Sequence, residues 1–138
     1  MPARVLVLSA VLLFLADQSV KSWALLRLRN GRAVALGAMR LRVVLHRPAG
    51  NRGGVRLVAL WLAELVALVA LVQVSPFFQG AVAPVALGAA LGGAGSNLMD
   101  RLLRGGVVVD VIDLRVWPVF NLADVAIVGG AVIGALHI

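Results

Sequence analysis

Four long apolar stretches, separated by polar segments, dominate the chain. They cover approximately residues 3–26, 55–74, 79–97 and 120–138. The hydrocarbon core of a bilayer is ~30 Å thick, and a helix needs ~20 residues to cross it. Each stretch is close to that length, so the pattern predicts four transmembrane helices. We treat residues 1–138 as one membrane-embedded domain.

The connections between these stretches differ in length and character. Residues 75–79 form a short link that should close the second and third spans into an antiparallel hairpin. The longer connections, residues 27–54 and 101–119, then lie together on the opposite side of the membrane. Within the first, Met39–His46 begins with alternating apolar and basic residues, which is typical of a surface strand. The pattern therefore predicts an all-α integral membrane protein with a small β-containing cap.

Composition supports a membrane protein. The chain is 62% hydrophobic, with a mean hydropathy of +1.01, and a soluble domain is nearer half apolar. Its net charge of +7 comes mostly from arginine, and eight arginines fall between Arg27 and Arg56. Because the basic segment has no stacking set of aromatics, we expect membrane lipids with anionic headgroups as partners, and no nucleic acid.

Several chemistries and one processing signal are disfavoured. The chain has no cysteine, which excludes disulfides and thiolate chemistry. His46 and His137 are too far apart to form a metal-site motif, so we expect no metal and no cofactor. The first stretch could be a signal peptide ending at Ala16, but Phe14 occupies a position where cleavage requires a small residue. We favour a retained helix.

Two aspartates, Asp110 and Asp124, flank the start of the last stretch, fourteen residues apart. A carboxylate near a bilayer is costly and needs a partner or a task. Two carboxylates brought together can share one proton and activate a water molecule. Asn121 and Asp124 also suit a helix cap, as N-cap and N3 residues, and the local pattern leaves both interpretations open.

Two further groups of polar residues lie on shared helical faces. Asp17 and Lys21 are four residues apart and can pair, either as a buried ion pair or as one wall of a membrane cleft. Asn97, Asp100 and Arg101 face the same way at the end of the third stretch. A helix end meeting water would explain one charge there, but not an amide, an acid and a base together.

Other features have simpler explanations or none. The glycines of the third and fourth stretches, at spacings of four, favour close helix packing. Asp113 suits a solvated loop residue. Glu64, near the middle of the second stretch, is a functional candidate by default, either protonated or paired with an arginine of the cap, and we assign it no role.

Taken in order, the polar segments resemble the lipoprotein signal peptidase family, also called signal peptidase II. The matching pieces are residues 17–21, 92–101, 108–113 and 117–124. The four-span layout and the length also match, so the resemblance covers nearly the whole chain.

The resemblance implies a membrane-embedded aspartyl protease of the bacterial cytoplasmic (inner) membrane, with its active site and cap on the extracytoplasmic face. Its substrate would be a diacylglyceryl-modified prolipoprotein, cut just before the lipidated cysteine. The catalytic dyad maps onto Asp110 and Asp124. The family's supporting site residues map onto Asp17, Lys21, Asn97, Asp100, Arg101 and Asn121. No metal or cofactor is implied, and we expect a monomer.

The chain departs from the family pattern in several places. Arg47 stands where an asparagine is usual, unless Asn51 substitutes for it, and Ser96 replaces a glycine. The turn between Arg101 and Asp110 is one residue longer than usual. The positive-inside rule would also place the arginine-rich connection in the cytoplasm, opposite to the family topology. We follow the motifs, because arginines on a surface strand can bind anionic lipid.

Two alternatives to an active peptidase are open. A catalytically weak relative could bind signal-peptide or lipid substrates without cleaving them, which the altered residues 45–53 favour. A small transporter or proton conduit could instead use Asp17, Glu64 and the paired aspartates.

Overall fold

Long apolar runs become helices because a helix satisfies its own backbone polar groups in hydrocarbon. The computed structural model describes residues 1–47, 54–75, 78 and 80–137. Its helices in this part of the chain are α1 (Pro2–Arg27), α2 (Gly54–Val74), α3 (Val82–Leu103) and α4 (Leu122–Leu136).

The first three helices are long and apolar enough to cross a membrane, judged by length and composition. Helix α4 is also apolar but has only 15 residues. Its length of about 22 Å is shorter than a ~30 Å hydrocarbon core. Three of the predicted spans are therefore supported, and the fourth stays a prediction.

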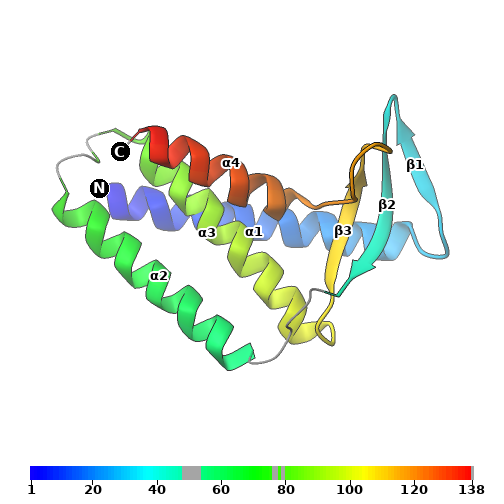
Figure 1. Cartoon of the computed structure of the whole chain (residues 1–138), viewed down its shortest axis with the longest axis horizontal. Coiled ribbons are helices and arrows are strands. Elements are labelled where there is room, and N and C mark those ends of the chain that lie inside the picture. Colours follow the sequence, from blue (N-terminus) through cyan, green and yellow to red (C-terminus); the bar gives the residue numbers. More distant parts are fainter. Residues whose placement is uncertain (48–53, 76–77, 79, 138) are drawn as a thin grey trace.

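Helix boundaries place the polar residues differently from the predicted spans. Helix α3 continues to Leu103, beyond the expected end at residue 97, so Asp100 and Arg101 are helical. Helices α2 and α3 run antiparallel, as expected for a hairpin (Figure 1). Residues 76, 77 and 79 of the connecting link lie outside the described residues.

The two long connections meet in a three-stranded antiparallel sheet. The strands are β1 (Ala33–Leu36), β2 (Met39–His46) and β3 (Val108–Asp113), in the order β1-β2-β3. The predicted strand at Met39–His46 is confirmed as β2, while the sequence pattern did not predict β1 or β3. The sheet lies at the opposite end of the helices from both termini (Figure 1). The predicted β-containing cap thus unites both long connections.

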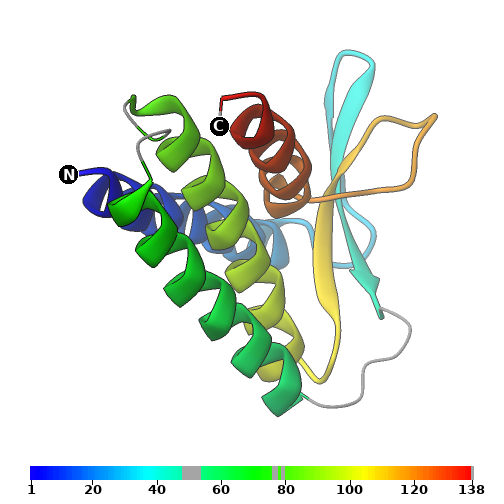
Figure 2. The same cartoon turned by 60° about the vertical axis from the view of Figure 1, so that its left-hand side comes forward.

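Small residues allow the helices to approach closely. Helix α3 runs between α2 and α4 (Figure 2). A Cβ added at Gly88 or Gly92 would lie 2.2 Å from a carbonyl oxygen of α1, and one at Gly130 of α4 would lie 2.3 Å from the Ala86 oxygen. Gly129 has nothing within 4 Å of such a Cβ. Close packing is therefore confirmed for Gly88, Gly92 and Gly130.

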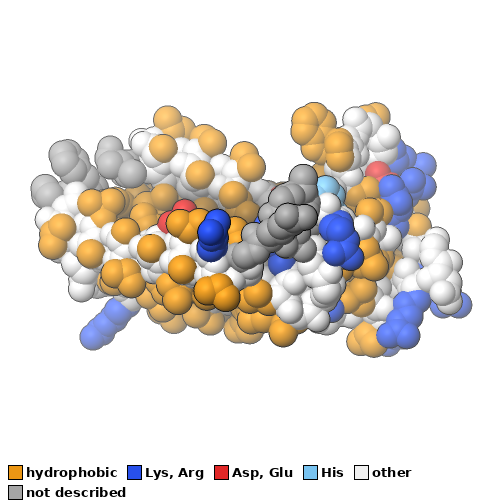
Figure 3. All heavy atoms as spheres, turned by 60° about the horizontal axis from the view of Figure 1, so that its bottom comes forward, with side chains coloured by type: hydrophobic (Ala, Val, Ile, Leu, Met, Phe, Trp, Pro, Cys, Tyr) orange, Lys and Arg blue, Asp and Glu red, His pale blue; other side chains and the backbone are white. Residues whose placement is uncertain are grey.

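The outer surface of the helices is largely hydrophobic. Figure 3 shows hydrophobic side chains spread over the helical part and basic side chains gathered near the sheet. Leu12, Leu60 and Val128 are each more than 60% exposed. Such an apolar exterior suits a hydrocarbon solvent.

Candidate active site

A cluster of buried charges joins α1 to α3. The Lys21 ammonium lies 2.7 Å from Asp17 Oδ2 and 2.8 Å from Asp100 Oδ2, and all three side chains are 0% exposed. A buried charge is tolerated when it is paired and hydrogen-bonded. The i,i+4 spacing on α1 thus forms the expected ion pair, with Asp100 as a third member. Because all three side chains are completely buried, the cluster cannot line an open membrane cleft, and its role is to hold α1 and α3 together.

Neutral groups satisfy the remaining oxygens of this cluster. Gln18 Nε2 donates to Asp100 Oδ1 at 2.9 Å and to Ser96 Oγ at 2.9 Å, and Ser96 Oγ donates to Asp17 Oδ2 at 2.5 Å. Backbone N–H groups of Val109 and Ala123 donate to Asp100 and Asp17 at 3.1 and 3.0 Å. The cluster therefore fixes the positions of β3 and α4 relative to α1 and α3.

Two asparagines extend the network from Lys21 to the predicted dyad. Asn97 Oδ1 accepts from Lys21 Nζ at 2.9 Å and from Asn121 Nδ2 at 3.0 Å. Asn121 Nδ2 also donates to Asp110 Oδ1 at 3.0 Å, and Asn97 Nδ2 donates to Asp124 Oδ1 at 3.1 Å. Each aspartate is thus tethered to one member of a bonded asparagine pair. The structure brings Asp110 and Asp124 into one network.

Asn121 and Asp124 also cap α4. Asn121 Oδ1 accepts from the Asp124 N–H at 2.8 Å, and Asp124 Oδ2 accepts from the Asn121 N–H at 3.1 Å, which forms a capping box. The cap uses Oδ2 of Asp124, while Oδ1 faces Asn97. The capping interpretation is confirmed, and it holds the Asp124 carboxyl beside Asn97 without excluding a chemical role.

Asp110 has an unusual electrostatic environment on β3. It pairs with Val44 of β2 across the sheet and is 6% exposed. Burial, and next the negative charge of Asp124, raise its pKa to about 6, against smaller opposing effects of His46, Lys21 and the Asn121 hydrogen bond. Asp110 can therefore carry a proton at a pH where an ordinary aspartate is ionised.

Asp113, three residues along β3, is held in the opposite way. Arg40 Nε and Arg42 Nε donate to its Oδ2 at 2.5 and 2.7 Å, and the Arg115 N–H donates to Oδ1 at 2.7 Å. These donors, Arg40 first, hold the pKa of Asp113 well below its usual range. The expectation of a solvated loop residue is wrong, because pairing of β2 with β3 sets Arg40 opposite Asp113.

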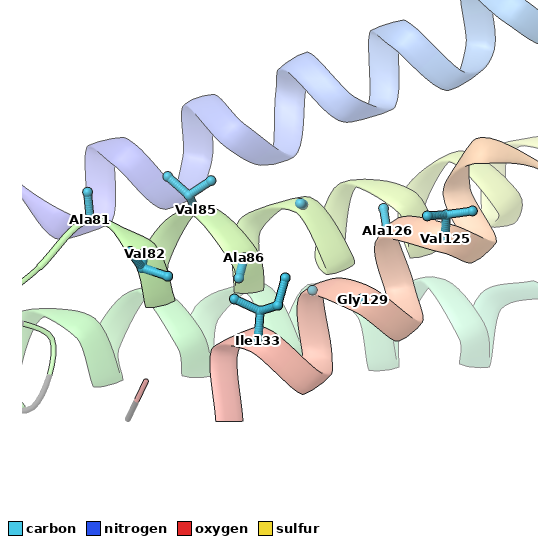
Figure 4. Close-up of a pocket in the computed structure, with 10 residues that line it drawn as sticks. Ala81, Val82, Val85, Ala86, Val125, Ala126, Gly129 and Ile133 are labelled. Atoms are coloured by element: carbon cyan, nitrogen blue, oxygen red, sulfur yellow. The ribbon is translucent and has the colours of Figure 1, made fainter. Parts of the chain in front are cut away.

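Arg101 stands apart from the buried network. Its side chain, with those of Asn97 and Glu64, lines a groove of about 310 Å³ bounded by α2, α3 and α4. Larger cavities lie away from the aspartates. One of about 500 Å³ between α3 and α4 is lined by apolar residues such as Val85, Ile133 and Gly129 (Figure 4). Another of about 510 Å³ lies between α1 and α3. The candidate site is therefore not at the cavity with the largest volume.

Other residues take structural roles that spacing did not reveal. Arg47 donates to the Gly105 carbonyl at 3.0 Å and so ties the end of β2 to the turn before β3. Asn51, the suggested substitute for the missing asparagine, lies outside the described residues. Gln18 was not predicted as part of the site, and its place beside Asp17 in an apolar helix was the available signal. Within the described residues, no group of three His, Asp or Glu is placed to hold a metal ion.

Comparison with known proteins identifies the family. The family model for signal peptidase (SPase) II matches residues 9–138. A lipoprotein signal peptidase of Mycolicibacterium smegmatis is 35% identical over 93% of this chain and 57% of its own length, and one of Mycobacterium tuberculosis is 33% identical over 94% and 68%. One of Moorella thermoacetica is 70% identical over 31% of this chain and 28% of its own length.

Two solved structures share the fold. Both are described as a bacterial membrane enzyme, with TM-scores of 0.75 and 0.74. Their sequences are 23% and 24% identical to this one. Both matches cover 95% of this chain, and they cover 90% of the first solved chain and 85% of the second. Because the family model spans nearly the whole sequence and the fold agrees, the chain belongs to the signal peptidase II family.

Proposed function

We propose that this protein is an aspartyl endopeptidase that removes the signal peptide from diacylglyceryl-modified bacterial prolipoproteins, cutting before the lipidated cysteine. The observation that carries the proposal is the pair Asp110 and Asp124, each tethered to one of two mutually bonded asparagines. Family membership supplies the substrate class. Asp17, Lys21, Asn97, Asp100 and Asn121 position the pair, and Arg101 lines the adjoining groove.

The surroundings of the two aspartates suggest different roles in the first step. Asp124 accepts N–H donors on both oxygens and lies at a helix N-terminus, which suits an ionised general base. The raised pKa of Asp110 suits the proton donor. Asp124 would take a proton from a bound water as the water oxygen attacks the scissile carbonyl carbon, and Asp110 would protonate the carbonyl oxygen.

Collapse of the tetrahedral intermediate reverses these roles. Asp124 would give its proton to the leaving amide nitrogen as the carbon–nitrogen bond breaks, and Asp110 would recover a proton from one hydroxyl of the intermediate. The products are a carboxylic acid on the signal peptide and a free amine on the lipidated cysteine. Both aspartates return to their starting protonation states, so the cycle balances.

Members of this family are bacterial inner membrane proteins. We place the sheet and the dyad on the extracytoplasmic side, where a translocated precursor presents its cleavage site. The arginines near the sheet oppose this orientation by the positive-inside rule, and anionic lipid at that surface would neutralise them.

A gel-shift assay tests the proposal. Purified protein in detergent is mixed with a diacylglyceryl-modified precursor and, separately, with the same precursor lacking the lipid. We expect cleavage before the cysteine of the lipidated form alone, and none by Asp124→Asn. Efficient cutting of the unlipidated precursor would contradict the substrate class. A folded parent that binds the lipidated precursor without cutting it would instead identify a binding-only relative.

A further inference from the structure

The groove beside the dyad has a polar residue that the reaction does not use. Its walls include Trp61 and Glu64 of α2, Asn97 and Arg101 of α3, and Ile127 of α4. Asn97 also donates to Asp124, so one wall residue of the groove is bonded directly to the proposed dyad. The Trp61 indole N–H donates to the Leu91 carbonyl at 2.9 Å, which fixes this wall in place. A substrate held at the dyad would extend into this groove.

Glu64 is an exposed residue on the groove wall and has no partner among the described residues. It is ten residues from each end of α2, at the middle of a helix long enough to span the membrane. Among the described residues, its carboxyl group makes no hydrogen bond or ion pair, unlike the acids Asp17 and Asp100 of α1 and α3. A carboxyl group at this depth is costly unless something satisfies it. The occupant of the groove is the available source of a donor.

Charge and depth indicate what kind of occupant fits. Arg101 lies near the sheet end of the groove, and Glu64 is seven residues, or about 10 Å along α2, deeper than the lining residue Leu57. Lipid headgroups do not reach mid-span, whereas a signal helix does. An ammonium group on that helix is costly at the centre of the membrane. A serine or threonine hydroxyl is the donor that fits this depth.

We propose that Glu64 is a specificity-determining residue that accepts a hydrogen bond from a serine or threonine in the signal helix, within about two helical turns of the cut. This inference rests on the proposed function, because it assumes that the precursor occupies the groove. Glu64 takes no part in the proton transfers. It favours precursors whose hydroxyl faces α2 over precursors with a wholly aliphatic signal segment.

A serine scan of the precursor tests the inference. Four lipidated precursors carry one serine each at successive positions of a leucine-rich signal segment, and a fifth carries none. We expect the parent to cut one serine precursor about tenfold faster in kcat/KM than the leucine precursor, the size of one net hydrogen bond. Glu64→Leu should bring that ratio close to one. Glu64→Gln should keep most of it, since an amide oxygen also accepts.

A relocated acid provides the matched control. Val66 is 67% exposed and lies two residues along α2, on a different helical face, so Glu64→Leu with Val66→Glu should not restore the preference. Equal rates for all precursors with the parent, or the same preference in Glu64→Leu, would overturn the inference. If a folded parent cuts none of the precursors, the proposed function fails. The relative binding of the same precursors to the parent and Glu64→Leu then decides the role of Glu64.

Discussion

The cluster around Lys21 and the pair Asp110–Asp124 hold carboxylates in opposite ways. In the cluster, Asp17 and Asp100 share a buried ammonium group, and their oxygens also receive hydrogen bonds from α1, α3 and neighbouring backbone. In the pair, the side-chain donors to Asp110 and Asp124 are the neutral amides of Asn121 and Asn97. The two regions share Asn97, which bonds both Lys21 and Asp124.

This difference indicates which acids hold the fold and which can perform chemistry. An ammonium partner keeps a carboxylate charged and fixed, while an amide positions it without neutralising its charge. Asp110 therefore feels both burial and the charge of Asp124, and its pKa rises. Asp113 on the same strand has two arginine partners, as the cluster acids have an ammonium partner, and its pKa falls. The cation partner, more than burial alone, separates structural acids from reactive ones.

Removing the cation from the cluster should have the largest effect on stability. Lys21→Met leaves two buried carboxylates without their shared partner, and we expect a loss of about 3–5 kcal/mol, read as a lower unfolding temperature in detergent. Arg104→Met is the matched control, because Arg104 pairs with the same Asp100 at 3.2 Å but is 30% exposed. We expect that control to cost about 1 kcal/mol or less. Equal losses would contradict the assigned role of the cluster.

Displacing α4 should affect the pair more than the cluster. Gly130→Ala puts a methyl group against the Ala86 carbonyl, and we expect it to destabilise by about 1–3 kcal/mol and to slow cleavage. Gly129→Ala, one residue earlier, meets nothing within 4 Å and should be nearly neutral in both measurements. Similar behaviour of the two variants would show that α4 is not seated as described.

The pH dependence of cleavage should report the proton on Asp110. Because its pKa is raised to about 6, the protonated form is lost as pH rises through that value. We expect kcat/KM to fall about tenfold per pH unit above it. Stability should change in the same direction, because the folded state binds this proton more tightly than the unfolded state. Asp110 alone should therefore lower stability as pH rises from about 4 to about 6. A flat rate between pH 5 and 8 would argue against Asp110 as the acid.

The smallest expected effect is at Ser96. Ser96→Ala removes the hydroxyl that links Asp17 to Gln18, but both keep other partners, so we expect a loss of about 1 kcal/mol in unfolding measurements and little change in kcat. Ser19→Ala, at an exposed position on α1, is the control. A large loss of activity with unchanged stability would place Ser96 in the reaction instead.

The helices and the site residues on them could be predicted because the patterns that indicate them lie within short segments of the sequence. Apolar length marks α1, α2 and α3, and the spacing of Asp17 and Lys21 predicts their ion pair. Asn121 and Asp124 likewise predict the cap of α4. The motifs placed the two aspartates within one family pattern, and the structure brings them into one network.

The remaining features depend on contacts between distant segments. The run of valines in β3 is compatible with a strand, but its pairing with β2 decides it, and the same pairing sets Arg40 against Asp113. Gln18 and Ser96 meet across 78 residues of sequence. The orientation of Glu64 into the groove follows from how α2 packs on α3, which apolar periodicity on an almost wholly apolar helix does not define.

The most direct test of the central claim compares two aspartates on one strand. The measurement is kcat/KM on the lipidated precursor for Asp110→Asn and Asp113→Asn, with folding of both variants checked by thermal unfolding. We expect Asp110→Asn to lose about a thousandfold or more, within the range of general acid–base catalysis, and Asp113→Asn to stay within about tenfold of the parent. Near-normal cleavage by Asp110→Asn, or equal losses in both variants, would contradict the assignment of the dyad.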